Sequence, residues 1–122
     1  MIIEKTIIDY LNTALTVPVT AERAIDPPPK FVLIERTAGG EQNHISYATI
    51  AIQTYAPSMY EAASLLEDVI DAMHGLIALD VIGSCTLSAS YNYTDVAEHY
   101  YRYQAVYNVT YYREDNINGN SN

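Results

Sequence analysis

The sequence has few of the residues that commonly staple a fold or build a reactive site. It has no tryptophan, one phenylalanine and one cysteine, Cys85. A single cysteine excludes a disulfide within the chain and is compatible with a reducing compartment. Twelve tyrosines contrast with these absences, so nearly all the aromatic side chains are phenols.

Basic residues are also scarce. Six Lys and Arg face fifteen Asp and Glu, which gives a formal net charge of −9. A protein that grips nucleic acid through its phosphates needs clustered bases, so this class of function is disfavoured. The same charge is compatible with a surface past which DNA slides without binding.

Patterns typical of metal, phosphate or catalytic sites are missing. His44, His74 and His99 stand apart, with no HExxH or CxxC around them. The glycine-rich "AGGEQN" matches neither of the common phosphate-binding patterns. We therefore expect structural histidines, a buried and inert Cys85 thiol, no metal or cofactor, and no enzymatic activity.

The N-terminal segment predicts an amphipathic helix over residues 3–14, because Ile3, Ile7 and Leu11 recur at helical spacing. Glu4, Lys5 and Asp9 interrupt its apolar residues. These charges argue against a signal peptide or a membrane span at this position.

Three strands are expected in the next part of the chain. A short edge strand can occupy 17–21, and β-branched residues predict strands at 31–37 and 44–56. Between the two longer strands, Gly39 and Gly40 can adopt positive φ. This predicts an antiparallel hairpin with a long, mobile loop.

The stretch "SMYE" is a capping box, in which Ser58 and Glu61 can satisfy each other at a helix start. The helix that follows is expected to reach His74 and to stop at Gly75. Its apolar stripe consists of Ala62, Leu65, Leu66, Val69, Ile70 and Met73.

Alternation of side chains predicts two more strands. In "CTLSASYNY" it places Cys85, Leu87, Ala89 and Tyr91 on one face. In the last strand one face is expected to carry Tyr101, Tyr103, Ala105, Tyr107, Val109 and Tyr111.

The order of elements, α-β-β-β-α-β-β, indicates an α+β fold. We expect an antiparallel sheet of four to five strands with two helices packed on one face. Residues 1–112 would form one domain, and residues 113–122 a disordered tail.

The tyrosines of the last strand allow two interpretations. Tyr has high β propensity, so the rings can pack within the subunit. A phenol also suits a half-wet surface covered by another subunit, and Arg is enriched at such interfaces. On the second interpretation the subunit-interface candidates are Tyr101, Tyr103, Tyr107, Tyr111 and Arg102.

Taken together, the segments "PPPKFVLIERTAGG", "IAIQTYAPSMYEAASL" and "YRYQAVYNVTYY" resemble a known family. The chain is similar over about residues 1–112 to the small tail-terminator or tail-completion proteins of long-tailed bacteriophages and prophages, especially of Gram-positive hosts. The resemblance is carried by the whole sequence and by no catalytic signature.

The resemblance implies a structural virion protein, assembled in the host cytoplasm, without chemistry or cofactor. Such proteins form a ring, usually of six subunits, that caps the head-proximal end of the tail tube. The implied partners are copies of the chain, the tube protein, the head-completion (stopper) protein of the neck, and genomic DNA passing through the lumen.

Two further sets of candidate residues follow from that role. Acidic residues of the second helix, Glu67, Asp68 and Asp71, could border the channel, although a solvated helix face also explains them. The loop could order against the tube or neck; its candidates are Thr37, Gly39, Gly40, Glu41, Gln42 and Asn43.

Other functions remain open. A stopper protein shares the small size and ring symmetry. A small-molecule-binding or regulatory domain would need an apolar pocket with convergent polar groups. A small enzyme is the least favoured, because the acids and histidines form no recognisable constellation.

Overall fold

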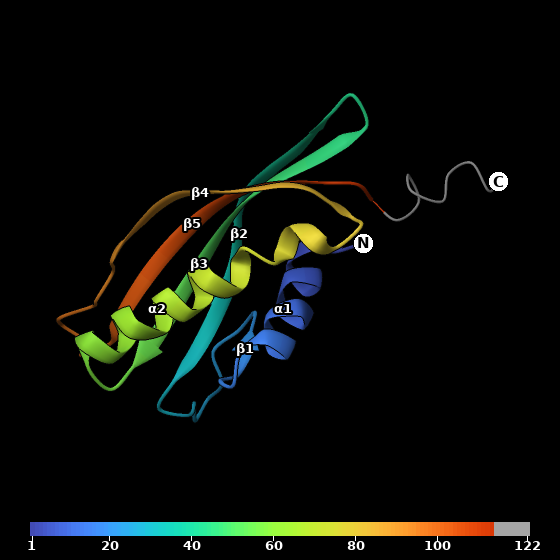
Figure 1. The fold of residues 1–122 in the computed structure, drawn as a ribbon. Helices are drawn as coiled ribbons and strands as arrows, with labels where there is room; N and C mark the ends of the chain where they lie inside the picture. Colours follow the sequence, from blue (N-terminus) through green and yellow to red (C-terminus); the bar gives the residue numbers. More distant parts are fainter. Residues whose placement is uncertain (114–122) are drawn as a thin grey trace.

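One β-sheet and two helices that cover one of its faces make up the computed structural model, which describes residues 1–113 (Figure 1). The predicted α+β class and the order of elements are confirmed. All of the predicted disordered tail except Arg113 lies outside the described residues. The elements are α1 (Ile3–Ala14), β1 (Val19–Thr20), β2 (Phe31–Gln42), β3 (Ile45–Ala56), α2 (Met59–Met73), the 3₁₀ helix η1 (Leu76–Ala78), β4 (Ile82–Asn92) and β5 (Tyr101–Tyr111).

The strand order in the sheet is β1-β2-β3-β5-β4. All neighbouring pairs are antiparallel except β1 and β2, which run parallel. The sheet is therefore mixed, and the prediction of a purely antiparallel sheet is wrong at this edge. The reason is that segment 21–30, which contains Pro27–Pro29, connects the two strands and returns the chain to the same end of the sheet, so β2 begins in the direction of β1.

The core lies between the helices and the sheet. α1 buries Ile3, Ile7 and Leu11, the residues whose spacing predicted it. α2 buries five side chains of its predicted apolar stripe, while Ile70 stays half-buried. Helix amphipathicity thus directs one stripe of each helix onto the same sheet face.

A side-chain hydrogen bond joins the two helices. The Tyr10 hydroxyl of α1 donates to the Ala72 carbonyl of α2 over 2.6 Å. Gly75 follows α2 and makes room for this contact, since a Cβ there would lie 2.3 Å from the Tyr10 hydroxyl. Gly75 has φ −84°, so its role is close approach and not a positive φ.

The capping box at the start of α2 is confirmed. The Ser58 hydroxyl accepts from the Glu61 backbone N–H over 3.2 Å and donates to the Glu61 carboxylate over 2.9 Å. One of the unpaired N–H groups at the helix start is satisfied in this way. The helix continues to Met73, with His74 as its C-cap.

The predicted long loop between β2 and β3 is wrong. The two strands pair up to Gln42 and Ile45, and the turn holds only Asn43 and His44, with φ 54° and 66°. Two consecutive positive φ values suit the right-handed twist of a two-residue hairpin.

The glycines of this hairpin are strand residues, and no described glycine has a positive φ. Gly40 pairs with Tyr47, whose ring lies over it and shields the backbone that a glycine leaves bare. A one-residue bulge at Thr37, between Arg36 and Ala38, absorbs the irregular spacing.

The predicted face of the fourth strand is also corrected. A bulge between Leu87 and Ala89 shifts the register against β5 by one residue. Cys85 and Leu87 lie on the helix side, whereas Ala89 and Tyr91 pair with β5 residues of the opposite face.

The last strand has the predicted alternation, but its tyrosine face is the face covered by the helices. Tyr107 is 2% exposed and Tyr111 6% exposed, and both belong to the core cluster. These two residues are corrected from interface candidates to core residues, because the helices of their own subunit already cover them. Tyr101 and Tyr103, nearer α2's first turn, are half-buried.

Candidate functional site

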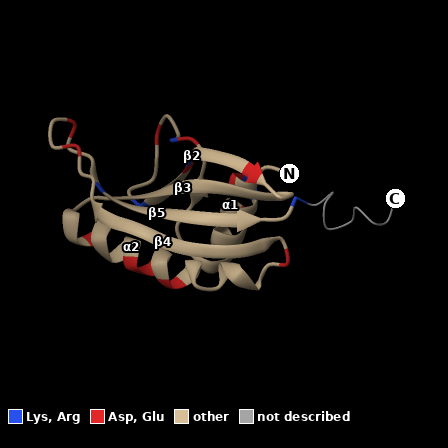
Figure 2. Cartoon of the chain, turned by 90° about the horizontal axis from the view of Figure 1, so that it is seen from above, with Lys and Arg blue, Asp and Glu red and all other residues tan. Residues whose placement is uncertain are grey.

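The sheet face opposite the helices is a broad surface almost without charge. Strands β3, β4 and β5 carry one charged residue, Arg102. In Figure 2 these strands are almost entirely tan, while the red positions of acidic residues lie on α2, on connecting loops and on β2. The acidic residues that give the chain its net charge of −9 therefore lie away from the centre of the open face.

Amides and hydroxyls on this face form a hydrogen-bonded ladder across three strands. Tyr55 of β3 donates to Gln53 over 3.2 Å, Gln53 donates to Gln104 of β5 over 2.8 Å, and Gln104 donates to Tyr91 of β4. The polar groups of these side chains hydrogen-bond to one another along the sheet surface. The open face is therefore polar, ordered and neutral at this place. The sequence analysis did not single out the two glutamines, whose meeting depends on strand register.

Arg102 is built into one end of this ladder. It donates from Nη1 to the Tyr55 hydroxyl over 2.8 Å and from Nε to the Tyr93 carbonyl over 2.7 Å. Its guanidinium lies 4.4 Å from the centre of the Tyr93 ring. The connection between β4 and β5 folds Tyr93 back over Arg102, so this arginine stacks on Tyr93.

Tyr100 is in contact with a second arginine, Arg23. The Arg23 guanidinium lies 4.1 Å from the Tyr100 ring centre and donates to its hydroxyl. Tyr100 also packs edge-on to Tyr55, which stacks on Phe31 with ring centres 4.5 Å apart. Two of the six bases are thus held against phenols at one end of the sheet.

The β4 edge of the sheet has no strand partner on its outer side within residues 1–113. Its eleven residues include no charge and no proline, the two features that most often discourage edge pairing. Only bulges at Gly83 and Ser88 interrupt it. At the other edge, β1 pairs only with Val32 and Leu33 of β2.

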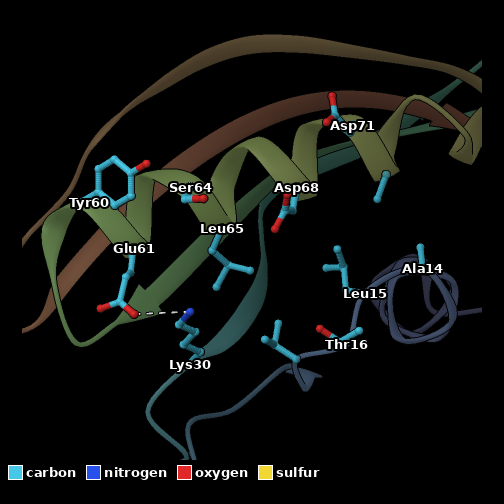
Figure 3. Close-up of a pocket in the computed structure, with 12 residues that line it drawn as sticks. Ala14, Leu15, Thr16, Lys30, Tyr60, Glu61, Ser64, Leu65, Asp68 and Asp71 are labelled. Atoms are coloured by element: carbon cyan, nitrogen blue, oxygen red, sulfur yellow. Dashed lines mark ion pairs between the residues drawn. The ribbon is translucent and has the colours of Figure 1, made fainter.

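Figure 3 shows a groove of about 670 Å³. It runs between α2 and the segment that follows α1. Its apolar side chains include Leu15, Val17 and Leu65. The Lys30 ammonium and the Glu61 carboxylate close one end with an ion pair of 3.4 Å.

The three acidic candidates of α2 do not face the same way. Asp68 and Asp71 line the groove beside α1, as their spacing of three residues predicts. Glu67 lies on the other flank of α2 and borders a separate hollow with Tyr91 and Tyr103. All three side chains are exposed on the helix-bearing side of the sheet.

The candidates for the tube or neck contact lie in the β2–β3 hairpin. Thr37, Gly39, Gly40, Glu41 and Gln42 are exposed residues of β2, and Asn43 is the first turn residue. They form an ordered ribbon that projects from the body of the domain (Figure 1) and not the mobile loop that was expected.

Cys85 and Tyr107 line a small hollow next to His74. Burial raises the pKa of the Cys85 thiol to about 11. Burial, and then the nearby Cys85, raise the pKa of Tyr107 to about 12, and its hydroxyl has no hydrogen-bond partner among residues 1–113. Both groups are therefore neutral near pH 7, which is the opposite of an activated nucleophile.

Within residues 1–113, no three His, Cys, Asp or Glu side chains gather in a way that could hold a metal ion. No helix in this range is long and apolar enough to cross a membrane.

No protein-family model matches the chain, and no curated protein sequence is significantly similar to it.

Proposed function

We propose that the chain is a ring-forming structural protein of the tail-terminator type. In this role it caps the head-proximal end of a phage tail tube and joins the tube to the neck. The supporting observation is a neutral sheet with an unprotected edge strand, in a chain whose charge is otherwise strongly negative. Such a sheet suits assembly better than an isolated particle.

Ring closure requires two different patches that meet between neighbours. The uncharged β4 edge is one such patch. The part of β2 beyond Leu33 is the other, since no strand pairs with its outer side within the described residues. Pairing of β4 with β2 of the next subunit would extend one sheet around the ring. Half-buried Tyr101, Tyr103 and Arg102 would lie at its tyrosine-rich end.

In such a ring the open sheet face suits the lumen. Its amides and hydroxyls are hydrogen-bonded to one another, and its one base, Arg102, is held by Tyr55 and Tyr93. A neutral wall neither binds nor strongly repels a polyanion, so DNA can pass. The alternative, in which Glu67, Asp68 and Asp71 border the channel, would turn the helix layer inward.

The exposed hairpin tip remains the candidate for contact with the tube or neck. Glu41, Gln42 and Asn43 are exposed on a ribbon that the turn and the cross-strand Gly40–Tyr47 contact keep in shape. A preformed ribbon loses less conformational entropy on docking than a mobile loop.

The decisive experiment is electron microscopy of the purified protein, alone and mixed with tail tubes made from the tube protein of the same genome. We expect rings at one end of the tubes. Thr86→Lys places a charge on the β4 edge and should prevent closure. Thr13→Lys, an equal charge change at the exposed end of α1, should leave the rings intact.

The outcomes separate the candidate functions. A protein that stays monomeric at every concentration and ignores tubes would overturn the proposal. Binding to the portal side of filled heads, without capping tubes, would assign the stopper role instead. Equal ring formation by Thr86→Lys would exclude the β4 edge from the contact.

A further inference from the structure

We infer that the groove between α2 and the segment that follows α1 is a docking site for a basic, amphipathic helix of another protein. The inference concerns the helix layer, on the opposite side of the sheet from the open face. It does not depend on the proposed ring. Its basis is the combination of apolar floor, acidic wall and exposed tyrosine in one hollow (Figure 3).

The floor is apolar and reachable. Leu15 and Val17 are only half-buried and both line the hollow, and in Figure 3 Leu15 faces Leu65 of α2 across it. Ala14 and Ala72 add small side chains that keep the groove open. An apolar side chain from a partner would therefore find aliphatic contacts on both walls.

The wall has one sign of charge. α2 carries four acids and no base. Lys30 is the basic residue that lines the groove, and it forms an ion pair with Glu61 at the far end of the groove. Asp68 and Asp71 make no ion pair or side-chain hydrogen bond among residues 1–113. In Figure 3 Asp68 points into the gap, whereas the Asp71 carboxylate is directed away from it on the outer side of α2. A cationic partner would meet the uncompensated Asp68 carboxylate in the gap, and its flanking bases would reach that of Asp71.

Tyr60 supplies the feature that a merely solvated acidic face would lack. It is 83% exposed at the mouth of the groove. Its ring and hydroxyl have no partner among the described residues. Exposed tyrosines next to apolar hollows are typical of binding surfaces, because a large flat ring is immobilised there at low entropic cost.

The size of the groove selects the shape of the occupant. Its lining spans α2 from Tyr60 to Ala72, roughly 18 Å at 1.5 Å per residue. This length fits about three turns of a helix laid along α2, against the segment that follows α1. Apolar residues at i, i+3 or i+4 and i+7 would fill the floor, and flanking Lys or Arg would reach Asp68 and Asp71.

The test uses a synthetic three-turn peptide with a leucine stripe flanked by lysines. Binding to the full chain is followed by fluorescence anisotropy at low ionic strength. We expect Asp68→Asn/Asp71→Asn to weaken binding about five- to ten-fold, consistent with the loss of two exposed ion pairs. Glu67→Gln removes an acid from the other flank of α2 and should leave the affinity unchanged.

Two control peptides separate the contributions. Replacing the lysines with glutamates should abolish binding, and replacing the leucines with serines should weaken it strongly. Equal binding by the double variant, equal losses in Glu67→Gln, or full binding of the serine peptide would each overturn the docking site. Self-association lost in the double variant without peptide would also overturn it, because a second copy would then occupy the groove.

Discussion

At the scale of single residues, the strongest chemical effect is desolvation beneath β4. Cys85 is half-buried and Tyr107 is buried, so each has lost part of the hydration that would stabilise a thiolate or a phenolate. The Tyr107 hydroxyl has no partner, and an unpaired buried hydroxyl costs free energy. This cost arises because the core uses a tyrosine at a position where a phenylalanine would leave no hydroxyl unpaired.

The raised pKa of Cys85 predicts slow alkylation. With a pKa of about 11 instead of 9.0, the thiolate fraction near pH 8 falls about 100-fold. Iodoacetamide should therefore label the folded protein about two orders of magnitude more slowly than the urea-unfolded chain. Equal labelling rates would show that Cys85 is solvated.

The raised pKa values of Cys85 and Tyr107 determine how the free energy of unfolding changes with pH. Between about pH 9 and pH 11 the unfolded chain loses the Cys85 proton while the folded chain keeps it, so the free energy of unfolding falls as pH rises. Tyr107 adds a further fall above about pH 10. Urea unfolding of Cys85→Ser should show a smaller loss over this interval than the wild type.

At the scale of elements, the helix layer is held together by a few specific contacts. α1 and α2 are neighbours only over a short length, and the hydrogen bond from Tyr10 to the Ala72 carbonyl lies where they meet. Gly75 is required beside it because a Cβ would displace the Tyr10 hydroxyl.

This contact predicts a non-additive mutant cycle. Tyr10→Phe should lower the free energy of unfolding by about 1 kcal/mol, the net value of one part-buried hydrogen bond. Gly75→Ala should cost about as much, because the new methyl displaces the hydroxyl. In the Tyr10→Phe background, Gly75→Ala should cost little. Denaturant unfolding measures all four proteins, and additive losses would contradict the shared contact.

At the scale of the whole molecule, charge is separated between the two faces. The acids lie mainly on α2 and the loops, and the centre of the open sheet face is neutral (Figure 2). A ring built from this subunit would therefore have a lumen of quite different character depending on which layer turns inward. Net charge alone does not distinguish the two arrangements.

Lysine substitutions on each face test whether the open sheet face or the helix layer lines the lumen. Asn108→Lys lies on the open face, so it should make assembled rings retain DNA at low salt if that face lines the lumen. Asp68→Lys/Asp71→Lys should then leave retention unchanged. Retention by the aspartate variant alone would place the helix layer in the channel, as the sequence also allowed. Filter binding of DNA to rings confirmed by microscopy is the measurement.

The sequence by itself determined the helices, the capping box at Ser58, the strand periods and the α+β class, because caps and apolar periodicity are written within a few neighbouring residues. It also placed Asp68 and Asp71 on one helix face. Only the tertiary structure decided that β1 is parallel, that the Asn43–His44 turn is tight, and that Tyr107 and Tyr111 are core residues. Contacts between residues far apart in the chain determine the bulges, the sheet faces, the glutamine ladder and the groove. The local sequence pattern does not specify such contacts.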